Sequence, residues 1–106
     1  MKAQILDTLK LRKFDDARHH KETIWADDQG SINLICMRQG QELTTHTHHG
    51  NHIWIVVEGS GEFFSGGDSQ VIGAGKIVVV PELVQHGIRN TSKEDLVIAS
   101  ITAAGD

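Results

Sequence analysis

Residues 40–59, GQELTTHTHHGNHIWIVVEG, decide the fold of this chain. The first half, residues 42–48, is rich in threonine, and β-branched residues favour strands. The second half, residues 52–58, is apolar and again β-branched. Gly50 and Asn51 lie between the halves and are typical of a turn. The stretch therefore predicts two short strands, the second running back beside the first.

The rest of the chain repeats this pattern of short strands and glycine-containing breaks. Further strands are predicted at residues 22–26, 31–38, 62–65, 70–72, 77–80, 86–89 and 96–102. Short strands separated by turn signals at this spacing are typical of a β-sandwich or barrel. A chain of 106 residues has the length of one domain. We therefore expect an all-β barrel over residues 21–106, preceded by an N-terminal arm, residues 1–20, that contains a weak helix.

Composition and charge exclude several classes of protein. The formal net charge is −4 and the one basic run, residues 10–13, is short, which argues against a nucleic-acid-binding protein. The longest apolar runs, residues 53–57 and 77–80, fall far below the roughly 18 residues of a membrane span. The single cysteine excludes an internal disulfide and a cysteine-rich zinc site. Without an export signal, the free thiol favours a cytoplasmic location.

Four of the seven histidines are spaced as metal ligands. His46 and His48 are two residues apart, so on a strand they share one face. The turn after them brings His52 beside His48, and His86 follows Pro81 in another predicted strand. Imidazole nitrogens suit zinc, copper, iron and nickel. The sequence therefore predicts a transition-metal site, with ordinary barrel-lining histidines as the alternative.

The other conspicuous residues have more ordinary interpretations. His49 is out of phase with His48 and is expected to point outward. His19 and His20 lie in a charged stretch and are expected to be solvated. Cys36 is expected to be a small buried hydrophobic residue. Trp25 is expected in the core or at an interface.

Two sets of spacings resemble the cupin family. The first cupin motif is matched by Gly40, five residues, His46-Thr47-His48, three residues, His52, six residues and Gly59. The second motif is matched by Gly75, five residues, Pro81-Glu82-Leu83, two residues, His86, three residues and Asn90. Two residues depart from the family pattern: His52 replaces a glutamate and Leu83 replaces a glycine.

This resemblance implies a double-stranded β-helix, or jelly-roll, barrel around one divalent transition metal. The ligands it implies are His46, His48, His52 and His86, and the metals of the family are iron, manganese, nickel, copper and zinc. Without the glutamate the site keeps its full cationic charge, which favours anionic ligands. Small cupins are often homodimers, and the arm is a candidate for exchange between subunits.

The expected function is that of a metal-dependent enzyme acting on a small oxygen-bearing organic molecule. The reaction would be a dioxygenase-type oxidation or an isomerisation. The alternatives are a non-catalytic module that senses a metal or small molecule, and a degenerate cupin without metal. Trp54 and Phe64 are candidates for the substrate pocket, although Trp54 is equally explained by core packing. The last strand offers only Ser100 and Thr102 as polar side chains, so we expect a mostly apolar pocket.

Overall fold

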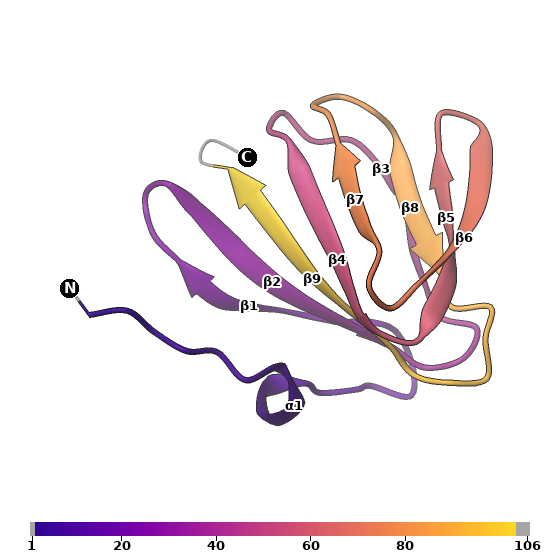
Figure 1. Cartoon of the computed structure of the whole chain (residues 1–106). Coiled ribbons are helices and arrows are strands. Elements are labelled where there is room, and N and C mark those ends of the chain that lie inside the picture. Colours follow the sequence, from indigo (N-terminus) through magenta and orange to yellow (C-terminus); the bar gives the residue numbers. More distant parts are fainter. Residues whose placement is uncertain (1, 104–106) are drawn as a thin grey trace.

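Two antiparallel sheets face each other in the computed structural model, which describes residues 2–103 (Figure 1). The last three residues of the expected 21–106 domain therefore lie outside the described residues. The elements are α1 (Thr8–Leu11), β1 (His20–Ala26), β2 (Gly30–Met37), β3 (Glu42–His46), β4 (His52–Glu58), β5 (Ser60–Ser65), β6 (Asp68–Gly73), β7 (Ile77–Val80), β8 (His86–Arg89) and β9 (Leu96–Ala103). The predicted all-β jelly-roll architecture is confirmed.

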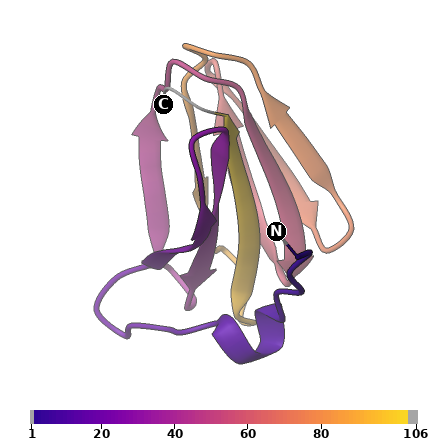
Figure 2. The same ribbon diagram turned by 90° about the vertical axis from the view of Figure 1, so that its left-hand side faces the viewer.

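The strand order explains how distant segments meet. One sheet has the order β1-β2-β9-β4-β7 and the other the order β3-β8-β5-β6. The loops β3–β4 and β7–β8 lie at the same end of the barrel, opposite the end that carries α1 (Figures 1 and 2). Residues 46–52 and 80–86 are thereby brought together. No helix within residues 2–103 is long and apolar enough to cross a membrane.

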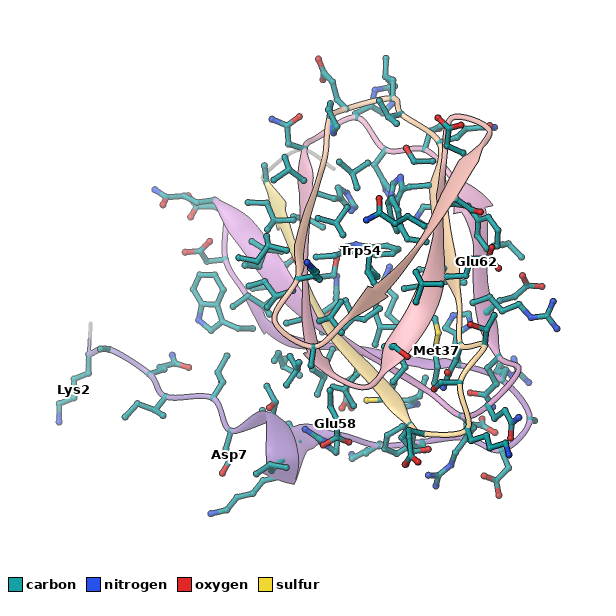
Figure 3. All side chains as sticks on the ribbon, turned by 45° about the vertical axis from the view of Figure 1, so that its right-hand side comes forward. Lys2, Asp7, Met37, Trp54, Glu58 and Glu62 are labelled. Carbon is teal, nitrogen blue, oxygen red and sulfur yellow. The ribbon has the colours of Figure 1, made fainter. Side chains whose placement is uncertain are left out.

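Alternate residues of the strands fill the space between the sheets, as strand geometry requires. The buried apolar cluster consists of Ile35, Met37, Trp54, Val56, Phe63, Ile72, Val80, Ile88, Leu96 and Ile98. Trp54 lies between the sheets (Figure 3) and is only 1% exposed. Its inward position follows from the alternation along β4, where His52, Trp54 and Val56 are buried in turn. The candidate metal ligands therefore lie at one end of a packed core.

Two residues of the cupin motifs have structural roles. Gly59 has a φ of +80°, and a Cβ there would lie 2.1 Å from the carbonyl oxygen of Asp95, so only glycine fits. Asn90 is fully buried, and its Nδ2 donates to the carbonyl oxygens of Met37, at 3.1 Å, and Glu94, at 2.8 Å. The close approach at Gly59 joins the β4–β5 turn to the start of β9, and the Asn90 bonds join the β8–β9 loop to the end of β2.

The arm packs against its own barrel along residues 11–19. Leu11 and Phe14 cover a second apolar cluster of Leu34, Cys36 and Val97 on the outer face of the five-stranded sheet. Arg12 Nη1 lies 2.9 Å from Glu58 Oε2. Burial raises the pKa of the Cys36 thiol, as expected for a core cysteine. Residues 2–6 are extended (Figure 1) and border a depression together with Trp25 and Ile32, and their exchange within a dimer stays a prediction.

His19 and His20 are half-buried, so the expectation that both are solvated holds only in part. His20 is the first residue of β1, and its Nε2 is buried. The Nδ1 of His19 lies 2.9 Å from the carbonyl oxygen of Glu42. The charged stretch before them is tied to the barrel, because Gln41 Nε2 donates to the carbonyl oxygen of Asp15 at 2.6 Å. Sequence alone does not show this docking, since the partners lie more than twenty residues apart.

Candidate metal centre

Four imidazoles gather at the end of the barrel opposite α1. His46 ends β3, His52 begins β4 and His86 begins β8, whereas His48 lies in the loop between β3 and β4. His46 pairs directly with His86 across the two strands. The predicted strand over residues 42–48 is thus too long by two residues. A register shift between Leu43 and His46, rather than regular alternation, sets the positions of His46 and His48.

Three of these rings converge. The candidate ligand atoms of His46, His48 and His86 all lie within 4.8 Å of one another. The ring centroids are 4.5 Å apart for His46 and His48, 4.3 Å for His46 and His86, and 5.5 Å for His48 and His86. Three nitrogen donors grouped in this way are the usual minimum of a catalytic transition-metal site.

Hydrogen bonds orient two of the rings for metal binding. The Nδ1 of His46 lies 2.7 Å from the carbonyl oxygen of Thr44, and the Nδ1 of His86 lies 2.9 Å from that of Val84. When Nδ1–H donates to a carbonyl, Nε2 keeps a lone pair for a metal. The Nε2 of His86 is buried, and within residues 2–103 it has no hydrogen-bond partner. A bound cation would satisfy this nitrogen, so the residues fit a metal.

Burial also keeps His86 in the form that binds metals. Desolvation, together with the neighbouring imidazoles, lowers the pKa of His86 to about 4. The ring is therefore neutral at neutral pH, as a ligand must be.

His52 lies beside the group of three but outside it. Its ring stacks on that of His48 at a centroid distance of 3.9 Å and lies 5.6 Å from that of His86. His52 is 3% exposed, so it faces the interior as the sequence predicts. The outward neighbour His49 is exposed. The structure thus places a fourth imidazole next to the site without grouping its nitrogen with the other three.

Trp54 and Phe63 form the floor below the imidazoles. The Trp54 ring lies 5.3 Å from His86 and 5.7 Å from Phe63, both in edge-to-face arrangements. Phe64, the other pocket candidate, lies half-buried on the opposite face of β5. There it borders a depression formed with residues 65–69 and Gln85. Neighbouring residues of a strand face opposite sides, and Phe63 is the residue that faces Trp54, so Phe64 faces away from it.

The space beside the imidazoles is polar, and the expectation of a mostly apolar pocket is wrong. A depression of about 290 Å³ adjoins His48 and His52. Its other lining residues are Lys21, Thr23, Ser31, Asn33 and Thr102. Apart from Thr102 they come from β1 and β2, whose contribution depends on a strand register that the sequence does not reveal. Thr102 is the one of these residues that the sequence analysis identifies, as a polar residue of the last strand.

Leu83 occupies a strained position directly above the site. Its φ is +65°, the left-handed region that favours glycine, and its N–H donates to the carbonyl oxygen of His48 at 2.7 Å. The side chain is 61% exposed, so little packing offsets the strain. This conformation explains why the cupin motif has glycine here.

Replacing Leu83 by glycine is expected to stabilise the protein. Relief of left-handed strain gains about 1–2 kcal/mol, and the greater freedom of glycine in the unfolded chain returns about 0.5–1 kcal/mol. The free energy of unfolding, measured by urea denaturation, should rise by about 0.5–1 kcal/mol. Leu83→Ala keeps the strain and serves as the control, with a change near zero. A Leu83→Gly variant less stable than Leu83→Ala would contradict this account.

Comparison with known proteins agrees with this geometry. The family model described as the cupin domain matches residues 33–102, which include both histidine motifs. The chain belongs to the cupin family. No curated protein matches it significantly.

Several solved structures superpose on most of the chain. A double-stranded β-helix protein from Klebsiella pneumoniae has a TM-score of 0.92 and 21% identity, over 99% of this chain and 93% of that one. An RmlC-like cupin from Desulfovibrio desulfuricans has a TM-score of 0.79 and 30% identity, over 96% of each chain. A protein from Thermotoga maritima described as a predicted oxalate decarboxylase has a TM-score of 0.74 and 19% identity, over 79% of this chain and 78% of that one.

Proposed function

We propose that this cupin is a metal-dependent enzyme for a small oxygen-bearing organic substrate. The observation that carries the proposal is the convergence of His46, His48 and His86 beside a polar depression large enough for such a molecule. These residues would hold the metal, with His52 as the fourth ligand. A divalent ion of iron, manganese, nickel, copper or zinc would supply Lewis-acid chemistry or, where it is redox-active, dioxygen chemistry.

The surrounding residues would bind and orient the substrate. Thr23, Ser31, Asn33 and Thr102 offer hydroxyl and amide groups in the lining of the depression, on the sheet that also carries His52. Trp54 and Phe63 close the barrel below and exclude water from the metal's inner side. Such a site supports either oxidation by dioxygen or isomerisation. The similarity to the Thermotoga protein is at the level of the fold and does not choose between them.

The experiment begins with metal analysis of protein expressed without a histidine tag. Protein loaded with iron, manganese, copper or nickel is then given enolisable substrates in an oxygen electrode and, in D₂O, followed by NMR. Oxygen uptake indicates oxidation, and exchange of a carbon-bound proton for deuterium indicates isomerisation. If neither oxygen uptake nor deuterium exchange is seen with any of these metals, the enzyme proposal is wrong.

A binding or sensor module is the second candidate. The observation in its favour is that, within residues 2–103, no aspartate or glutamate lines the depression, so the acid–base groups described there are the imidazoles and Lys21. Tight binding of small molecules without turnover would support it. In either role we propose a cytoplasmic location, for which the buried free thiol of Cys36 is the supporting observation.

Replacing His52 by glutamate should shift the metal preference. Carboxylates suit manganese better than imidazoles do, whereas imidazoles suit zinc and nickel. The ratio of manganese to zinc affinity, measured by competition with a chelating dye, should rise about tenfold. His52→Gln serves as the control, because it removes the imidazole without adding charge. An unchanged ratio in His52→Glu would show that residue 52 does not reach the metal.

A further inference from the structure

The depression beside His48 and His52 is lined by polar groups from strands far apart in the sequence. Lys21 and Thr23 come from β1, Ser31 and Asn33 from β2, and Thr102 from β9. Thr23 pairs with Asn33, and Ser31 pairs with Thr102, in adjacent strands of one sheet. The five side chains thus form one continuous polar wall on the sheet that also carries His52, which pairs with Thr102.

Hydrogen bonds within this wall leave donors for a ligand. Thr23 Oγ1 donates to Asn33 Oδ1 at 2.6 Å, so the amide N–H groups of Asn33 are the part of this side chain that can bind a ligand. Asn33 is 8% exposed, which fixes its position. The hydroxyls of Ser31 and Thr102 are 2.5 Å apart, and whichever accepts this bond keeps its own O–H to donate. Donors of this kind suit carboxylate and hydroxyl oxygens.

Among the described lining residues, Lys21 is the one that carries a fixed charge at neutral pH. The ion pairs found within residues 2–103 use Arg12, Lys13 and Arg38, and none uses Lys21. The next residue, Glu22, points to the other face of β1, where its Oε1 lies 3.8 Å from Lys13 Nζ. A positive group without a carboxylate beside it, in a chain of net charge −4, creates a local preference for anions.

We propose that Lys21, with Thr23, Asn33 and the Ser31–Thr102 hydroxyl pair, forms a carboxylate subsite. Its ligand is a small hydroxy- or oxo-carboxylate whose other oxygen reaches the imidazole group. A volume of about 290 Å³ corresponds to roughly ten water molecules, which admits a short organic acid. This inference deepens the proposed function, on which it rests for the metal-bound end of the ligand.

The test uses glycolate as the anionic probe and ethylene glycol as a neutral probe of similar size. Zinc-loaded and metal-free protein are titrated with each probe and followed by ¹⁵N–¹H NMR. Wild type should bind glycolate more tightly than ethylene glycol, with shifts at Thr23 and Asn33. Lys21→Met should weaken glycolate binding about tenfold, since a hydrogen bond to a charged group contributes roughly that factor. Its zinc content and its affinity for ethylene glycol should not change.

Two variants make the result specific. Lys21→Arg should restore most of the glycolate affinity, and Lys93→Met, which removes an exposed lysine in the loop before β9, should leave it unchanged. Equal affinities in Lys21→Met and Lys93→Met would overturn the subsite.

The metal-free titration separates this proposal from the proposed function. If the chain holds no metal but glycolate still shifts Thr23 and Asn33 in a Lys21-dependent way, the subsite stands and the metal enzyme falls. If zinc binds but glycolate shifts only the imidazoles, the subsite falls and the metal centre stands.

Discussion

Replacing His48 and His86 together by alanine is expected to abolish binding of divalent transition metals. The two residues supply two of the three nitrogens that lie within 4.8 Å of one another, and the two imidazoles left, those of His46 and His52, fall short of the three ligands of a metal site. Isothermal titration with zinc or nickel should show saturable 1:1 binding in wild type and none in the variant. Thermal unfolding gives a second readout. Metal at about 100 times its dissociation constant should raise the Tm of wild type by roughly 10 °C or more and leave that of the variant unchanged.

The matched control is His49→Ala, which removes an exposed imidazole adjacent to His48. It should keep both the affinity and the Tm shift. Because His86 is buried, the double variant is checked by circular dichroism. If it does not fold, the single variant His48→Ala carries the test, since that residue lies in a loop. Saturable 1:1 binding in the folded double variant, or an unchanged metal affinity in His48→Ala, would contradict the ligand assignment.

The sequence predicts most of this fold because its signals are local. Turn glycines and β-branched runs mark nearly every strand, and the fixed spacings of the two histidine motifs single out His46, His48, His52 and His86. The spacing works because each motif spans one chain reversal, so residues near in sequence are also near in space. The replacement of the family's glycine by Leu83 is visible in the sequence, but its strain is not, since φ is a property of the folded loop.

What the sequence does not predict comes from contacts between distant strands. The polar wall needs the registers of β1 with β2 and of β2 with β9, which pair residues up to 73 positions apart. The docking of the arm depends on partners more than twenty residues away, as in the bond from Gln41 to Asp15. Phe63 and Phe64 differ only in phase, and an apolar pair on one strand does not show which member faces inward.

Trp54 has two predicted roles, and its burial favours the one in the core. The sequence allows it either to stack on a substrate or to pack the core. A side chain 1% exposed, in edge-to-face contact with Phe63 and His86, has no surface left for a ligand. We therefore expect Trp54 to contribute to the stability of the barrel and to the position of His86.

Replacing Trp54 by alanine should lower the free energy of unfolding by about 3–5 kcal/mol, the usual cost of removing a fully buried aromatic side chain. Urea denaturation of the metal-free protein measures this loss. Trp54→Phe refills much of the volume and should lose less, while keeping metal binding and the affinity for glycolate. Trp25→Phe, at the half-buried tryptophan of β1, is the matched control and should change stability little. A loss below about 1 kcal/mol in Trp54→Ala would contradict the core role. Weakened glycolate binding in a stable Trp54→Phe variant would instead return this residue to the substrate site.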